Sequence, residues 1–282
     1  MQWVRPVECD ASRSGRSSLA NGIAWGYAPA MEDWALHMVV GVTFLLAGTV
    51  KGVVGVGLPT VAVACLTLMI GLAEAIALTV LPALVTNIWQ ASVGGHGHFL
   101  LKRLWPFLLA AALTIGLGAL VLSVADTRYL AILLGALLAT YGAVSLAGCS
   151  IRISEARRTA MGVGLGLLNG ALTGMTGAFN FPAVLYFQAI GLSRDQLIQA
   201  MGILFLLSSA VLGLALGGTG LFGGPLLSLS ALAVLPTALG MMAGQVIRKR
   251  LSEARFRRLF FVTLVLLGPA IAARALVSLA AG

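Results

Sequence analysis

The chain has 282 residues, of which 59% are hydrophobic and only 10% are charged, whereas about 25% of an ordinary soluble domain is charged. Together with a mean hydropathy of +1.00, this composition excludes a soluble globular protein and indicates an integral protein of the lipid bilayer. The net charge is +9, but no basic face interleaved with aromatic residues remains outside the apolar segments, so nucleic acid is excluded as a partner.

The N-terminal region, residues 1–35, differs in composition from the rest of the chain. It contains Arg5, Arg13 and Arg16, two serine clusters and no long apolar stretch. A secretory signal peptide needs an apolar stretch of at least about seven residues, so we do not interpret this region as one. We predict a disordered N-terminal tail, with Met31 as an alternative start of the chain.

Ten apolar segments follow the tail. Six of them have close to the ~20 residues that a helix needs to cross a bilayer, and the other four form two pairs that are too short. The segments are 36–50, 58–71, 75–93, 104–124, 129–147, 160–173, 181–190, 196–216, 225–247 and 259–279.

Glycine and proline interrupt each short pair. The first interruption contains Gly52, Gly55, Gly57 and Pro59, and the second contains Gly174, Gly177, Asn180 and Pro182. Glycine and proline at this density break a helix. Because unpaired backbone groups at membrane depth are tolerated only where they are buried in protein or line a polar cavity, we expect each break to face a binding site.

The two breaks also match in sequence, which indicates an internal repeat. Gly48, Lys51, Gly52 and Pro59 run parallel to Gly166, Asn169, Gly170 and Pro182, with an offset of about 120 residues. The repeats are residues 36–147 and 160–279, joined by a basic cytoplasmic linker, 148–159. Each is predicted as a broken, re-entrant hairpin followed by three full spans. An odd number of crossings inverts the second half, so we predict an all-α membrane protein with two inverted-topology repeats.

The distribution of basic residues predicts the orientation of the chain. If each broken hairpin returns to its own side, loops 94–103, 148–158, 191–195 and 248–258 share a side and hold twelve of the eighteen Lys and Arg residues. The opposite side holds four, because Lys51 lies inside the membrane and Arg274 near the last helix end. Basic loops stay on the cytoplasmic side, so both termini are predicted to lie outside.

Particular residues of the chain carry a resemblance to a known family. The glycine-rich break from Gly48 to Pro59, the turn Gly71-Leu72-Ala73-Glu74-Ala75 into a new helix and the weaker second copy resemble the TauE/SafE sulfite exporter family, also called TSUP, over about residues 36–280. The resemblance implies a permease, often of a bacterial inner membrane, that moves small anions such as sulfite, sulfonates or sulfur-containing organic acids. It also implies that the two copies face each other about a central site.

Lys51 is the most informative single residue. A cation well inside an apolar segment costs from ~2.5 kcal/mol upward on insertion scales, and it is by default a candidate for a functional site. An anion there would gain from the ammonium group and from the free N–H groups of the half-helix that starts near Leu58. The alternative is that Lys51 snorkels to the interface or pairs with carbonyls at a helix C-terminus.

Neutral polar residues complete the predicted substrate site. The second break offers Asn169, Thr173, Thr176 and Asn180, and the helix after the first hairpin offers Asn87, with Thr86 and Gln90 beside it. Ser208 and Ser209 lie in the corresponding helix of the second half. The alternative for all of them is helix packing, and for the two serines a hydroxyl bonded back to the preceding turn.

Glu74 and Asp195 open equivalent helices after the two hairpins. Acidic residues in a first helical turn are stabilising caps; the sharper hypothesis is a proton gate. His96 and His98 form a pair without a third ligand nearby in sequence, so no metal site is predicted.

The combined prediction is a secondary transporter of a small anion. No G-x-x-x-x-G-K-[ST] motif is present for ATP, no cofactor is predicted, and no oligomeric state is inferred. The alternatives are a polytopic membrane enzyme, for which no convincing Ser–His or metal constellation exists, and a membrane scaffold, which would need neither Lys51 nor the broken repeat.

Overall fold

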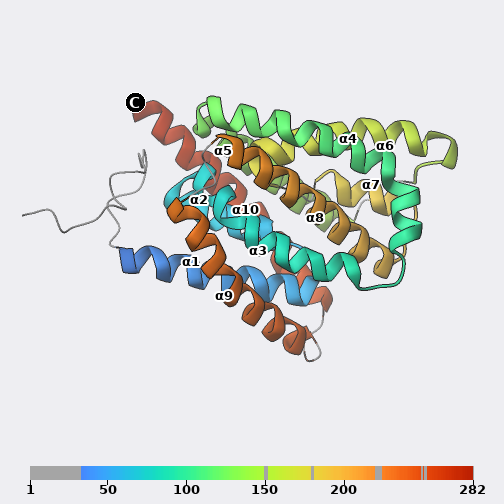
Figure 1. Cartoon of the computed structure of the whole chain (residues 1–282), viewed down its shortest axis with the longest axis horizontal. Helices are drawn as coiled ribbons and strands as arrows, with labels where there is room; N and C mark the ends of the chain where they lie inside the picture. The colour runs from blue at the N-terminus through green and yellow to red at the C-terminus, as the bar shows by residue number, and fades with distance from the viewer. Residues whose placement is uncertain are drawn as a thin grey trace, which may run out of the picture.

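The computed structural model describes residues 33–148, 152–178, 181–219, 224–248, 250 and 253–281, and all regular structure in them is helical (Figure 1). The predicted tail, apart from its last three residues, and Asn180 lie outside the described residues. The ten helices are α1 (Asp33–Val54), α2 (Leu58–Ile70), α3 (Leu72–Ser92), α4 (Gly97–Val124), α5 (Thr127–Ala147), α6 (Glu155–Thr176), α7 (Ala183–Ala189), α8 (Arg194–Thr219), α9 (Gly224–Arg248) and α10 (Glu253–Ala281).

Each predicted apolar segment coincides with one helix, but the first arm of each broken pair is longer than predicted. Helices α1 and α6 have 22 residues each, or about 33 Å, enough to cross a hydrocarbon core. The predicted apolar segments are shorter than these helices because α1 continues through Lys51 and α6 begins with the polar residues Glu155, Arg157 and Arg158. Only the second arms, α2 with 13 residues and α7 with 7, are short.

Seven helices among the described residues are long and apolar enough to cross a membrane, namely α1, α3, α4, α5, α8, α9 and α10. Their outward surfaces are apolar: Leu113 and Leu117 of α4 and Leu232 and Leu235 of α9 are all more than half exposed. Polar side chains such as Asn87 are instead fully buried inside the bundle. This inside-out distribution is what a lipid environment requires.

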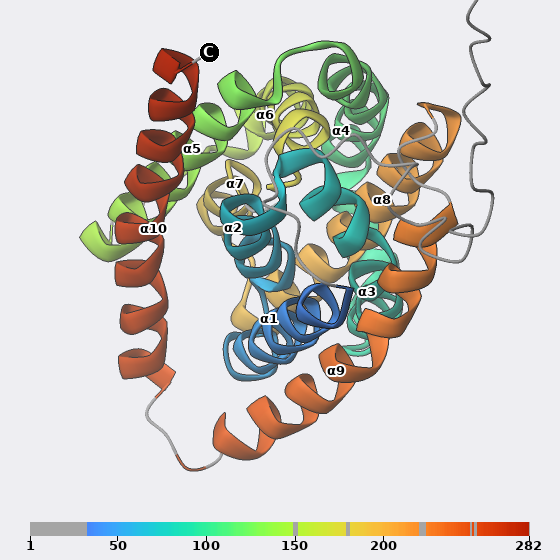
Figure 2. The same cartoon turned by 90° about the vertical axis from the view of Figure 1, so that its left-hand side faces the viewer.

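The helices pack in pairs (Figure 2), and small residues lie at the contacts. The most extensive pairs are α4 with α6, α1 with α9, and α5 with α10. In the first pair Gly166 and Gly170 lie against backbone of Phe107 and Ala111, and in the second Gly48 and Gly52 lie against backbone of α9. A Cβ atom at any of these four glycines would collide with a backbone oxygen, so glycine is what permits the close approach.

The basic loops gather at one end of the molecule. Arg103, near the start of α4, pairs with Glu155 at the start of α6 and donates to the Ile190 carbonyl at the end of α7, at 3.3 Å. The end of α1 lies at this end too, because Gly55 contacts Ile198 near the start of α8. Helices α4, α6 and α8 therefore start here, and α2 returns from here toward the opposite end. Helix α10 also starts here, since Phe260 in its third turn lies against Gly57 after the end of α1.

Candidate functional site

Lys51 lies in the last turn of α1 and is buried, with 3% of its surface exposed. Its ammonium group donates to the hydroxyl oxygen of Thr86, at 3.0 Å, and to the Oδ1 atom of Asn87. Both acceptors come from α3, so this contact joins the first hairpin to the helix that follows it. The lysine points into the protein and not toward the interface, which excludes the snorkelling interpretation.

The charge on Lys51 has no counter-ion among the described residues, since none of the ion pairs found there includes it. An ammonium group has three N–H donors, and Thr86 and Asn87 account for two of them. A buried cation held only by neutral acceptors is costly. The arrangement therefore has one positive charge available to an anion.

Two neighbouring amides have atoms that are not satisfied. The Nδ2 atom of Asn87 and the Oε1 atom of Gln90 are buried and have no hydrogen-bond partner in the described part of the chain. Most buried polar atoms in proteins are hydrogen-bonded, so these two atoms are available to a polar ligand or to water. The Nδ2 group of Asn87, on α3, can donate a hydrogen bond to an anion that binds next to the ammonium group of Lys51.

Proline and serine shape the helix that carries these acceptors. Pro82 lies inside α3, and because it has no N–H group it leaves the Leu78 carbonyl without its helical donor. The hydroxyl of Ser230 in α9 donates to that carbonyl, at 2.8 Å. One turn further on, the Thr86 hydroxyl donates to the Pro82 carbonyl, at 2.7 Å, which fixes the oxygen that Lys51 contacts.

The first break lies four residues after Lys51. Gly55 and Gly57 have φ angles of +87° and +107°, which other residues rarely adopt. Gln90 bridges the break to α8, because its Nε2 atom donates to the carbonyls of Gly55, at 2.9 Å, and Ile198, at 2.8 Å. Pro59 lies in the first turn of α2, whose N-cap, Gly57, provides no side-chain cap. Gly52 faces α9 and packs against it.

The second break has neutral side chains only. Asn169 and Thr173 are fully buried in α6, and the Nδ2 atom of Asn169 lies 3.5 Å from the Thr173 hydroxyl. The Oδ1 atom of Asn169 has no partner among the described residues. Thr176 ends the helix; its hydroxyl donates to the Leu172 carbonyl and accepts from the N–H group of Ala178, at 3.3 Å. Pro182 is the N-cap residue of α7.

Ser208 and Ser209 in α8 are fully buried, and neither hydroxyl has a hydrogen-bond partner within the described ranges. The interpretation that these hydroxyls bond back to the preceding turn is therefore wrong. They add two unsatisfied polar atoms to the second half, where Asn169 has a third.

The two predicted gate residues lie at opposite ends of the molecule. Glu74 is in the first turn of α3, and its carboxylate lies over Gly71 at the turn from α2. Asp195 is exposed in the first turn of α8, at the end with the basic loops. The structure brings neither into contact with Lys51, and both positions suit caps of helix N-termini.

Several buried polar residues were not predicted from the sequence, among them Ser230 and Gln199. Gln199 of α8 is 3% exposed; its Nε2 atom donates to the Ala91 carbonyl, at 2.9 Å, and its Oε1 atom accepts from the N–H group of His96, at 2.9 Å. The sequence does give a signal for Gln199, because its amide lies inside the apolar segment 196–216. Within the described ranges no three His, Cys, Asp or Glu residues group in a way that holds a metal ion.

Comparison with known proteins gives one match. The family model described as sulfite exporter TauE/SafE matches residues 40–271, which include both breaks and all helices that carry the buried polar residues. Searches of curated proteins and of solved structures found no match.

Proposed function

The chain belongs to the TauE/SafE sulfite exporter family, a family of membrane transporters and not of enzymes, and from this premise we propose that it moves a small anion by alternating access. The substrate class is sulfite, an organosulfonate or a sulfur-containing organic acid. The site lies between the two broken helical segments, with Lys51 as the counter-ion of the substrate.

The observation that carries this proposal is the unpaired charge of Lys51. A buried ammonium group without a carboxylate is stable in a membrane protein only at a cost, and a bound anion removes that cost. One positive charge suits a monoanion, or the partly neutralised charge of a dianion. Asn87, with its free Nδ2 donor, supplies a hydrogen bond from α3, so substrate binding would tighten α1 against α3.

The pattern of helix pairs supports two inverted repeats. If α1 to α5 correspond to α6 to α10, the pair α1 and α9 corresponds to α6 and α4, and both are among the most extensive pairs. The pairs α3 with α9 and α8 with α4 correspond in the same way, while α5 with α10 and α3 with α8 correspond to themselves. Exchange of the halves thus preserves the main contacts, as expected for an axis in the membrane plane.

The same arrangement supports the proposed orientation. Helices α1 and α6 start at opposite ends of the bundle, as inversion requires. The end with the basic loops is proposed to face the cytoplasm of a bacterium, with both termini outside the inner membrane. Rocking of one repeat against the other would then open the site around Lys51 and Asn169 to each side in turn.

The proposal is tested by replacing Lys51. We expect the Lys51→Met variant to insert and fold, since removal of a buried charge does not destabilise a bundle, but to bind sulfite at least about 100-fold more weakly. Lys51→Arg should lose about tenfold, because the charge stays while the size and donor geometry change. Binding is measured by thermal stabilisation of purified protein and transport by uptake into proteoliposomes.

The matched control is Lys102→Met, which removes an exposed lysine of α4 and should leave binding unchanged. A folded Lys51→Met variant with wild-type affinity and transport would disprove the role of Lys51 as counter-ion.

A further inference from the structure

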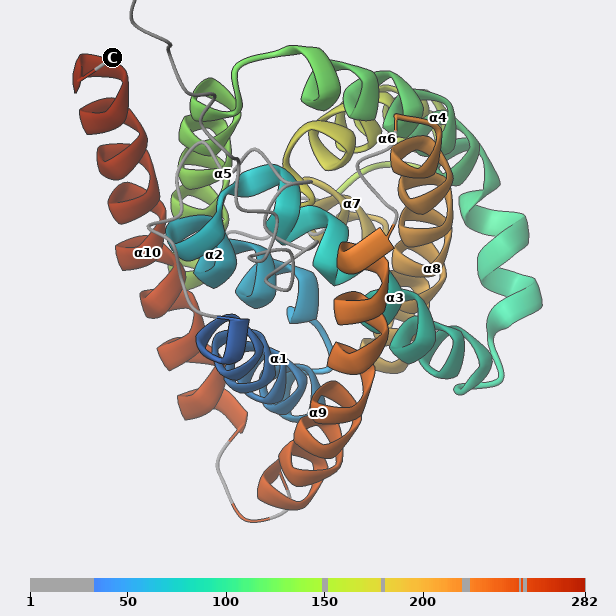
Figure 3. The ribbon, with the colours of Figure 1, turned by 60° about the vertical axis from the view of Figure 1, so that its left-hand side comes forward.

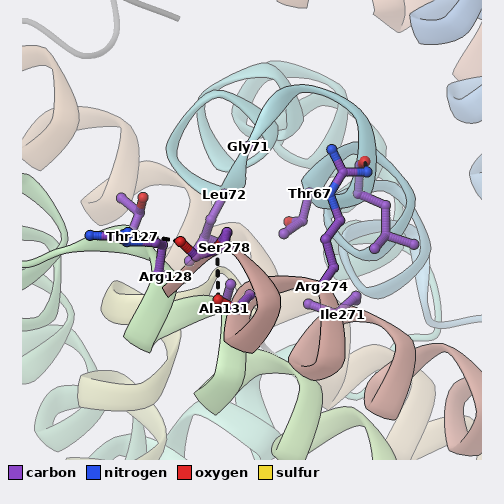
Figure 4. Close-up of a pocket in the computed structure, with 11 residues that line it drawn as sticks. Thr67, Gly71, Leu72, Thr127, Arg128, Ala131, Ile271, Arg274 and Ser278 are labelled. Carbon is purple, nitrogen blue, oxygen red and sulfur yellow. Dashed lines mark hydrogen bonds between the residues drawn. The ribbon is translucent and has the colours of Figure 1, made fainter. Parts of the chain in front are cut away.

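A surface hollow lies at the end of the molecule opposite the basic loops. Its walls come from the α2–α3 turn, the start of α5 and the C-terminal half of α10 (Figure 4). The lining residues are Thr67, Leu68, Gly71, Leu72, Thr127, Arg128, Ala131, Ile271, Arg274, Ala275 and Ser278.

Two guanidinium groups line the hollow. Arg274 comes from α10 and Arg128 from α5, on different walls (Figure 4). Arg128 pairs with Asp126, with 2.6 Å between Nη2 and Oδ2, and donates to the Ser278 carbonyl, at 3.2 Å. Arg274 has no ion pair with a carboxylate of the described residues. The carboxylate of Glu74 lies over Gly71, another lining residue, and none of the ion pairs of the described residues joins it to either arginine.

Arg274 has more hydrogen-bond donors than its contact with α2 uses. It donates to the Leu68 carbonyl at the end of α2, but a guanidinium group has five N–H donors in a planar fork. A single carbonyl uses only part of that capacity. The hydroxyl oxygen of Thr67, also in the lining, is buried and has no hydrogen-bond partner in the described residues. The hollow thus combines a guanidinium group that is in none of the ion pairs of the described residues with an unsatisfied hydroxyl.

This hollow is separate from the Lys51 site. Phe260 of α10 lies against Gly57, which belongs to the first break, and Arg274 follows Phe260 by 14 residues (274 − 260) along α10. At 1.5 Å per residue these two positions of α10 are about 21 Å apart along the helix. A ligand bound at Arg274 would therefore be a second ligand.

We propose that the hollow is a binding site for an oxyanion. Arg274 holds the oxyanion, together with Thr67 and with Arg128 on another wall of the hollow. Planar N–H pairs of arginine match the oxygens of phosphate, sulfate and sulfite. The oxyanion is either a free inorganic ion or the phosphate of an anionic lipid headgroup, and both meet the same donors. The site goes beyond the proposed transport function and does not depend on it.

The experiment uses the full chain with the Lys51→Met change, so that the proposed substrate site does not contribute. Purified protein in a neutral detergent is titrated with inorganic phosphate in one arm and with a short-chain phosphatidylglycerol in the other, and the unfolding temperature is followed. At least one of them should raise that temperature, and Arg274→Gln should need at least about tenfold more ligand for the same shift. A response to phosphate alone assigns the free ion, and a response to lipid alone assigns the headgroup.

The matched control is Arg257→Gln, which removes an exposed arginine from the other end of α10 and should respond like its parent. Thr67→Val, which removes the hydroxyl at nearly constant volume, serves as a second variant if Arg274→Gln does not fold, and it should also weaken the response. The proposal is overturned if neither ligand shifts the parent protein, or if the folded Arg274 and Thr67 variants both respond as the parent does.

Discussion

The two broken segments of this protein have the same backbone plan and different chemistry. In each, a 22-residue helix leads into a glycine break and a short returning helix (Figure 3). In the proposed alignment of the two repeats, Lys51 of the first corresponds to Asn169 of the second. Gln90 of α3 bridges the first break to α8, whereas Thr173 and Thr176 of α6 itself hold the second.

The difference separates the role of the backbone from the role of the charge. Glycines on the faces toward α9 and α4 are needed in both halves, because both first arms pack backbone to backbone. Among the described residues, a buried cation is present in one half only. In the proposed site this single charge would attract one anion, and the neutral half would add hydrogen bonds to it.

The largest effect is expected from the glycines shared by the two segments. Gly52→Leu and Gly170→Leu would each push a side chain into the backbone of the partner helix and should destabilise the fold by about 3 kcal/mol or more. Gly41→Leu and Gly164→Leu are controls in the same two helices, since an added Cβ meets nothing within 4 Å there. Size-exclusion profiles and thermal unfolding compare the two variants with their two controls. If the controls destabilise the fold as much as the variants do, that result contradicts the packing argument.

The second prediction moves the charge from one segment to the other. Lys51→Asn should lose anion binding as Lys51→Met does. In the double variant Lys51→Asn with Asn169→Lys, the ammonium group stands on α6, and affinity should recover by about tenfold or more over the single variant. Titration of purified protein with sulfite measures the recovery. No recovery in a folded double variant would show that the two positions are not equivalent toward the substrate.

A smaller effect is expected when the neutral segment loses its amide. Asn169→Ala removes a hydrogen bond worth about 1 kcal/mol to an uncharged group and should weaken sulfite binding up to about tenfold. Thr263→Val, which changes an exposed hydroxyl of α10, should leave binding unchanged. If Asn169→Ala weakened sulfite binding as much as Lys51→Met does, the first segment would not hold the dominant binding group, and the proposed assignment would be wrong.

The last prediction concerns the stability of the fold without substrate and the bridge at the first break. Gln90→Leu removes two hydrogen bonds, to the Gly55 and Ile198 carbonyls, and should lower stability by about 2 kcal/mol. Gln188→Leu is the control, because Gln188 is exposed in α7. Thermal unfolding in the absence of substrate compares them. Equal unfolding temperatures would mean that the first break is held without Gln90.

Much of the candidate site was visible in the sequence because charge in an apolar segment is rare. Lys51, Asn169 and the two glycine breaks were predicted on composition and spacing alone. The lengths of α1 and α6 were not, because the apolar segment stops at the first polar residues while the helix continues. Lys51 donates hydrogen bonds to Thr86 and Asn87, and Glu155 pairs with Arg103 and Arg158. A helix end depends on such partners, which come from other helices.

The sequence by itself determined that this is a helical membrane protein, where its helices break and which residue brings a charge into the bilayer, because these properties follow from local hydropathy and from the backbone limits of glycine and proline. Only the tertiary structure decided which groups meet. It placed Asn87 beside Lys51, left Asp195 at an exposed helix start, and brought Arg274 from the last helix to the end of α2. Contacts between residues so far apart in the chain depend on how whole helices pack, and no local pattern contains that information.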